Sequence, residues 1–339
     1  MRRFALPTAL LVLLAPFVAE ADERTRAGRQ LSGLHTSDGT WAALYRYVPE
    51  GGAAGARARV LLFPDVGMNH RAFDLGGRGL APYLMRRGFE VLVLEYRGAG
   101  ASQVPLGGFG FSDLVDRDAE AALAAATEDG SRVVLGGHGL GGTIAFVLAG
   151  RHPDRVAGVV GLQAAAMLDV PNEPVGRLLD SLDCAPPWLD LATLSRTSLF
   201  HGRSWFEVMA ANDGSISAEV AARLQRFGLA PIPRCLAAEL SGFMRSGRIE
   251  AGGADARETI RGWKGPSLLF FAPLDNWVHP EFATPMRDVL EGETQVRVLS
   301  VVEGTSVDLG HLGTLFSDSA RLSVYDPIVD FLEGKGGAP

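Results

Sequence analysis

Histidines, cysteines and glycine-rich turns are the features of this 339-residue sequence that could take part in chemistry. Metal binding is recognised by ligand spacings such as H-E-x-x-H, and none is found around His70, His138, His152, His201 and His279. The two cysteines have no histidine pair nearby, which does not favour zinc. The turn from Gly98 to Ser102 lacks the glycine spacing of a dinucleotide-binding motif. We therefore expect no metal and no cofactor.

The most distinctive turn lies between Val133 and Gly142. It reads Val-Val-Leu-Gly-Gly-His-Gly-Leu-Gly-Gly, which predicts a strand, a sharp turn and a helix. The segment resembles the nucleophile elbow of α/β-hydrolases, where G-x-S-x-G holds the catalytic serine on a strained turn. Gly139 stands at the serine position, and we expect the neighbouring His138 to line a pocket. Taken alone, the segment could also be a glycine-rich turn in an unrelated open sheet.

Two earlier segments strengthen the resemblance. Residues 60–69 are similar to the strand and oxyanion loop of the family, and residues 88–102 to its next strand and R-G-x-G-x-S turn. The resemblance implies an oxyanion hole made of the N–H groups of Val66 and Leu140. Where the family usually has His-Gly, this chain has Pro64-Asp65. An ionised Asp65 beside the hole would disfavour a developing oxyanion.

The other two triad positions follow in the chain order that the family requires. Asp275 lies in a turn after an apolar run and resembles the acid, and His311 lies in a Gly-His turn and resembles the base. Without a serine hydroxyl, triad-dependent rate should fall by a factor on the order of 10⁶. The resemblance and the missing serine therefore imply a lipase- or esterase-like, capped pseudoenzyme.

Three routes to activity or binding stay open at this point. Ser102, Thr143 or Ser306 could act as a displaced nucleophile, with Ser306 the best placed because it lies in the His311 loop. Alternatively, the His311–Asp275 dyad could act as a general base in a hydrolase or lyase of ester-like or lipid-like substrates. The third route is binding of a hydrophobic small molecule or a protein partner beneath a cap rich in large apolar side chains: Trp188, Phe200, Trp205, Phe206, Met209, Phe227, Phe243 and Met244.

The elements that must position these residues alternate between strands and helices. Apolar runs predict strands over 41–48, 60–63, 89–95, 133–135, 156–162, 267–272 and 295–301, with 41–48 at the sheet edge. Helical patterns cover 72–87, 112–128 with Ser112 as N-cap, 140–150, 280–290 and 319–332. This alternation indicates an α/β fold with a mostly parallel sheet flanked by helices. Residues 167–262, which show no strand pattern, are expected to form a helical cap between core parts 22–166 and 263–339.

The N-terminal residues indicate that the protein is exported. Residues 1–21 combine two arginines, an apolar run and Ala19-Glu20-Ala21, which is typical of a signal peptide, so we expect export to the periplasm or the cell exterior. The apolar run is too short and too interrupted by Pro7 and Pro16 to span a membrane, so we expect no stable membrane span once the signal peptide is removed. In an oxidising compartment Cys184 and Cys235 could form a disulfide or remain free thiols.

A net charge of -7 without charge blocks does not indicate binding to nucleic acid or anionic membranes.

Overall fold

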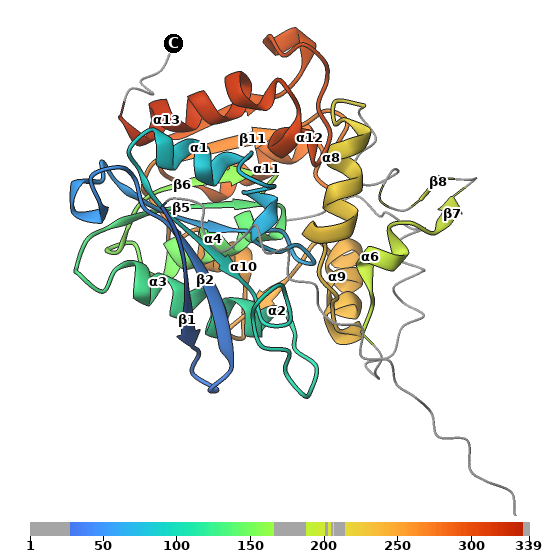
Figure 1. Ribbon diagram of the computed structural model, residues 1–339, viewed down its shortest axis with the longest axis horizontal. Coiled ribbons are helices and arrows are strands. Elements are labelled where there is room, and N and C mark those ends of the chain that lie inside the picture. Colours follow the sequence, from blue (N-terminus) through green and yellow to red (C-terminus); the bar gives the residue numbers. More distant parts are fainter. Residues whose placement is uncertain (1–27, 166–187, 201–202, 205, 207–213, 335–339) are drawn as a thin grey trace, which may run out of the picture.

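The computed structural model describes residues 28–165, 188–200, 203–204, 206 and 214–334 (Figure 1). Its centre is an eight-stranded sheet in the order β1-β2-β4-β3-β5-β6-β11-β12. The pairs β1–β2 and β2–β4 are antiparallel and the remaining pairs are parallel. The strands are β1 (Arg29–His35), β2 (Trp41–Tyr47), β3 (Arg59–Phe63), β4 (Glu90–Glu95), β5 (Val133–His138), β6 (Val156–Leu162), β11 (Ser267–Phe271) and β12 (Thr294–Val298).

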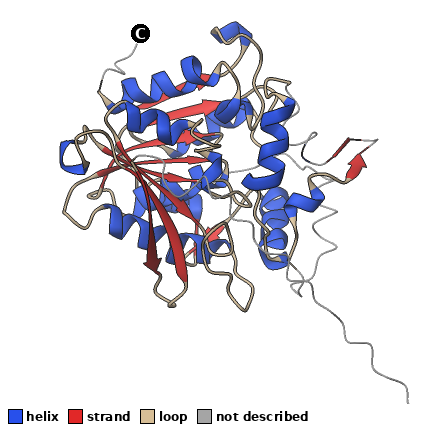
Figure 2. Ribbon diagram, in the orientation of Figure 1, coloured by secondary structure: helices blue, strands red, loops and turns tan. Residues whose placement is uncertain are grey.

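Helices cover both faces of this sheet (Figure 2). Alternate residues of each central strand point to opposite faces, so Leu61 and Phe63 of β3 join one apolar cluster and Val60 and Leu62 the other. The helices outside the cap region are α1 (Leu80–Arg86), α2 (Phe111–Asp113), α3 (Glu120–Ala126), α4 (Leu140–Arg151), α11 (Ala283–Val289), α12 (Gly313–Phe316) and α13 (Asp326–Leu332). The predicted mostly parallel sheet flanked by helices is therefore confirmed.

Two details of the predicted elements are wrong. The edge strand is β1, while β2 pairs with both β1 and β4, because the mostly exposed β1 sequence carries no apolar alternation to reveal it. Ser112 is not an N-cap, since α2 begins at Phe111 after Gly110. The backbone N–H of Gly110 donates to Asp113, whereas the Ser112 hydroxyl donates to the Glu250 carbonyl oxygen.

The described part of the segment between β6 and β11 contains the helices α6 (Leu191–Leu194), α8 (Ala218–Arg223), α9 (Arg234–Ser246) and α10 (Ala256–Ile260). The expectation of no strands there is wrong, because β7 (Ser198–Phe200) pairs with β8 (Arg203–Ser204) and β9 (Glu250–Ala251) pairs with β10 (Ala254–Asp255). These hairpins are too short to produce an apolar alternation. The cap boundaries stay a prediction, since residues 166–187 lie outside the described ones.

A buried ion pair fixes the turn after β4. Arg97 donates from Nε and Nη2 to Asp118 Oδ1, at 2.9 and 2.8 Å, and its backbone N–H donates to Asp118 Oδ2. Asp118 is fully buried, and this burial raises the pKa of its carboxyl despite the arginine. Removing one partner of such a pair leaves an uncompensated buried group and costs about 3–5 kcal/mol.

We expect Arg97→Met to lower the free energy of unfolding by about that amount, measured by urea denaturation. The control is Arg117→Met, because Arg117 is 41% exposed and its ion pairs with Asp38 and Asp113 lie at the surface. Its loss should cost less than about 1 kcal/mol. Equal losses in the two variants would contradict this account of the turn.

Candidate functional site

The candidate site lies where β3, β5, β11 and β12 end, since the loops that follow these parallel strands carry its side chains. Gly139 joins β5 to α4 with φ 54° and ψ −127°, a left-handed backbone that favours glycine. Gly141 brings α4 against β3, because a Cβ on it would lie 2.2 Å from the carbonyl oxygen of Phe63. The glycines thus provide the sharp turn that the sequence predicts, and they also allow α4 to cross close to β3.

Asp65, in the loop after β3, has its carboxylate in front of this turn. Its Oδ1 accepts hydrogen bonds from the backbone N–H of Val66 at 2.8 Å and from that of Leu140 at 2.9 Å. These are the two donors of the oxyanion hole that the family resemblance implies. A Cβ added to Gly139 would lie 2.4 Å from the Cγ and Oδ2 atoms of Asp65. Asp65 therefore fills the space in front of Gly139 and engages both donors.

His311 lies between two carboxylates. Its Nδ1 contacts Asp275 Oδ2 at 2.8 Å, and its Nε2 contacts Asp65 Oδ2 at 3.0 Å. The fully buried Asp275 is held by the backbone N–H groups of Trp277 and Val278, which donate to its Oδ1. The structure thus brings Asp65, Asp275 and His311 into one hydrogen-bonded chain, although they are far apart in the sequence.

The charge of His311 and that of Asp65 depend on each other. Burial alone would lower the pKa of His311, but the charges and hydrogen bonds of Asp275 and Asp65 outweigh it and raise the pKa to about 10. Burial opposes ionisation of Asp65, yet His311 and the backbone donors keep the pKa of its carboxyl below the usual value. At neutral pH His311 is therefore an imidazolium.

His138 lies at the end of β5 and is completely buried. Its Nε2 lies 2.9 Å from the carbonyl oxygen of His311, and the two imidazole rings are 4.3 Å apart. Burial, and then the charge of His311, lower the pKa of His138 to about 4, so its ring is neutral at pH 7. Its Nδ1 is buried without a hydrogen-bond partner in the described part of the chain.

The hydroxyl groups considered as displaced nucleophiles are engaged elsewhere. Ser102 accepts from the N–H of Ala43 and donates to the carbonyl of Glu95, so it holds a turn. Thr143 donates to the carbonyl of Ala165 within the core. Ser306 is exposed and bonds to Ser319, and both ring nitrogens of His311 are occupied by carboxylates. The contact between Asp65 and His311 Nε2 was not predicted from the sequence, although Asp65 was expected beside the oxyanion hole.

The large cap side chains that are described mostly pack inward. Phe206, Phe243 and Met244 are buried, and the Trp188 ring meets Phe109 edge-on. Trp205, Met209 and the side chain of Phe200 lie outside the described part of the chain. Cys184 does too, so its disulfide with Cys235 stays a prediction.

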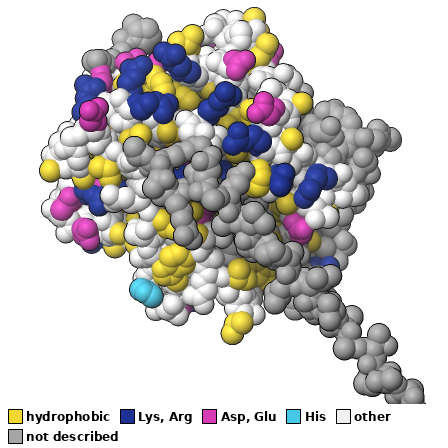
Figure 3. All heavy atoms as spheres, in the orientation of Figure 1, with side chains coloured by type: hydrophobic (Ala, Val, Ile, Leu, Met, Phe, Trp, Pro, Cys, Tyr) yellow, Lys and Arg dark blue, Asp and Glu magenta, His cyan; other side chains and the backbone are white. Residues whose placement is uncertain are grey.

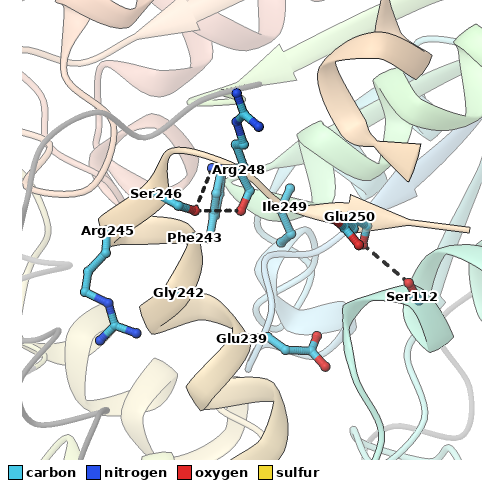
Figure 4. A pocket seen from close by; sticks show the side chains of 9 residues that line it. All are labelled: Ser112, Glu239, Gly242, Phe243, Arg245, Ser246, Arg248, Ile249 and Glu250. Atoms are coloured by element: carbon cyan, nitrogen blue, oxygen red, sulfur yellow. Dashed lines mark hydrogen bonds between the residues drawn. The ribbon is translucent and has the colours of Figure 1, made fainter. Parts of the chain in front are cut away.

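A groove of about 730 Å³ lies beside the C-terminal part of α9 (Figure 4). Its lining includes Glu239, Arg245 and Arg248 and shares no residue with the Asp65–His311 chain. On the face seen in Figure 3, basic and acidic side chains lie interspersed with apolar ones. Among the described helices, none combines the length and apolar character that crossing a bilayer requires.

Comparisons with known proteins agree on the fold. Residues 68–207 match the model of the alpha/beta hydrolase fold family. No curated protein matches the sequence. Among solved structures, a thermophilic esterase from Thermogutta terrifontis is 19% identical with a TM-score of 0.61, covering 90% of this chain and 98% of its own. An enol-lactonase from Burkholderia xenovorans LB400 is 18% identical with a TM-score of 0.64, covering 89% and 100%. An esterase from Exiguobacterium antarcticum is 16% identical with a TM-score of 0.66, covering 90% and 100%. This chain has the α/β-hydrolase fold.

Proposed function

We propose that this protein has lost the serine chemistry of the α/β-hydrolase fold and instead binds a hydrophobic ligand or a protein partner. The observation that carries the proposal is the carboxylate of Asp65, which accepts both backbone N–H groups and bonds to His311. Gly139 stands at the position of the family's serine and supplies no nucleophile.

Asp65 closes the site to ester carbonyls as well. An acyl substrate must place its carbonyl oxygen between the N–H groups of Val66 and Leu140, where Asp65 Oδ1 already lies. Hydrogen bonds to a charged acceptor contribute about 1.5–3 kcal/mol each, so a neutral carbonyl is a poor competitor. Loss of the serine and occupation of the hole therefore act in the same direction.

The competing possibility is a hydrolase or lyase that uses the His311–Asp275 dyad. A general base must be unprotonated, and the high pKa of His311 leaves its ring charged at neutral pH. A displaced nucleophile would have to contact His311 Nε2. Among the described side chains, the hydrogen bond to this atom is made by Asp65. Its side chain is 20% exposed, so it is accessible to a ligand.

The fold relatives named above are esterases and a lactonase, which supports a hydrophobic ligand that binds without placing a carbonyl in the hole that Asp65 occupies. Export is proposed on the signal-like residues 1–21, which lie outside the described part of the chain. The intact mass of exported protein tests it: retention of Met1–Ala21 would contradict it.

The activity proposal is tested with the mature protein in the presence of EDTA on p-nitrophenyl butyrate and decanoate. We expect no turnover above buffer, and mass spectrometry of an organic extract should show a bound apolar molecule. His311→Ala serves as the comparison, with His152→Ala as a control because His152 pairs with Glu120 at the end of α4. Turnover in the wild type that His311→Ala abolishes and His152→Ala leaves intact would overturn the proposal.

A further inference from the structure

We propose that Asp65, His138 and His311 bind one divalent metal ion, most favourably Zn²⁺. Each of the three offers a ligand atom, and these atoms lie within 4.8 Å of one another. The inference goes beyond the proposed function and does not rest on it, because metal binding is measured directly. We refer to these three residues as the His–His–Asp cluster.

In each residue of the cluster, the polar atom that would not bind the metal is already held. Asp65 Oδ1 accepts the two backbone N–H groups described above. His311 Nδ1 bonds to Asp275, and His138 Nε2 bonds to the carbonyl oxygen of His311. Metal-binding histidines almost always donate their second nitrogen to a carboxylate or carbonyl in this way, which fixes the ring orientation. The arrangement leaves Asp65 Oδ2, His311 Nε2 and His138 Nδ1 as ligand atoms.

His138 supplies an independent observation. The residue is completely buried, and its Nδ1 has no hydrogen-bond partner in the described part of the chain. Leaving a buried polar atom unsatisfied costs about 1–3 kcal/mol, so native proteins rarely do it without a reason. A metal ion would satisfy this atom. The neighbouring contact between His311 Nε2 and Asp65 Oδ2, at 3.0 Å, is close to the separation of two ligand atoms on one ion.

The ligand types determine which ion fits. Two imidazoles and one carboxylate suit Zn²⁺ and related transition metals, whereas Ca²⁺ and Mg²⁺ prefer sites built from oxygen. Binding would replace the proton that His311 Nε2 shares with Asp65. Three protein ligands leave a fourth position for water or a ligand oxygen, as in catalytic rather than structural zinc sites.

The test uses the full mature chain after EDTA treatment and dialysis, titrated with Zn²⁺ by calorimetry and with Co²⁺ by visible absorption. We expect one ion per chain and the intense absorption of tetrahedral Co²⁺. Asp65→Asn and His138→Gln should each weaken Zn²⁺ binding at least ~10-fold, as expected when a ligand is lost. His152→Gln is the matched control and should bind like the wild type. Asp65→Asn keeps the size of a partly exposed side chain, and near-ultraviolet circular dichroism checks that each variant is folded.

Two results would overturn the inference. One is that the wild type binds no Zn²⁺ or Co²⁺ in these titrations, and the other is that folded Asp65→Asn binds Zn²⁺ with unchanged affinity and stoichiometry. Because the esterase assay is run in EDTA, failure of metal binding leaves the proposed loss of serine chemistry intact. Conversely, esterase activity in EDTA would refute the latter without bearing on the metal site.

Discussion

The double variant Asp65→Gly/Gly139→Ser is expected to hydrolyse p-nitrophenyl butyrate at least ~10³-fold faster than the wild type. Removing the Asp65 side chain frees the N–H groups of Val66 and Leu140 for a substrate carbonyl. The new serine stands beside His311, which then has one carboxylate partner, Asp275, and a lower pKa. Single oxyanion donors contribute about 10²–10³ in rate and the triad contributes more, so a thousand-fold gain is a conservative expectation.

The single variants separate the effect of the missing nucleophile at Gly139 from that of the oxyanion hole filled by Asp65. Gly139→Ser alone should stay inactive, because its Cβ would lie 2.4 Å from the Asp65 carboxyl group. Asp65→Gly alone should also stay inactive, since it opens the hole without supplying a nucleophile. Asp65→Gly/Gly139→Ala is the matched control that adds a Cβ but no hydroxyl. If Gly139→Ser alone matched the double variant, Asp65 would not be the obstacle.

Stability should be greatest near pH 6.5 and should fall in both directions because of the two buried histidines. His311 has a folded pKa of about 10 against 6.5 for a free histidine, so its contribution is complete below pH 6.5 and is lost as the pH rises toward 10. The full loss is on the order of a few kcal/mol. His138 has a folded pKa of about 4, so the unfolded chain takes up a proton first as the pH falls below 6.5. That loss is on the order of 3 kcal/mol.

Urea unfolding between pH 4.5 and 10 measures both limbs, and the variants assign them. His311→Gln should flatten the alkaline limb and leave an acid limb, whereas His138→Gln should flatten the acid limb. Asp65 does not contribute to this acid limb, because its lowered pKa places the loss of its contribution below the ordinary carboxyl range and so below pH 4.5. An alkaline limb of equal slope in the wild type and His311→Gln would show that His311 is not held between two charges.

Much of the fold could be predicted from the sequence because its central strands are buried on both faces. Runs such as Val60–Phe63 and Val156–Leu162 are almost continuously apolar, which is how buried parallel strands read. The mostly exposed β1 carries no such pattern and was missed. The turn around Gly139 was predictable because the close helix crossing leaves no room for side chains at Gly137 and Gly141.

The site was predictable only in part. The order of Gly139, Asp275 and His311 along the chain indicates which turns meet at the end of the sheet. The direction of the Asp65 side chain depends on two backbone donors from separate loops, and no local pattern encodes it. The His–His–Asp cluster has the same origin: its members follow β3, end β5 and follow β12, so no metal-ligand spacing could appear.

The central claim is that Asp65 occupies the oxyanion hole and the space in front of Gly139. Labelling with a fluorophosphonate, measured as a change in intact mass, tests this claim most directly. The account predicts one phosphonyl group per chain in Asp65→Gly/Gly139→Ser and none in the wild type or in Gly139→Ser. The Asp65→Gly/Gly139→Ala control should also remain unlabelled. Complete labelling of Gly139→Ser, with Asp65 still present, would contradict the account.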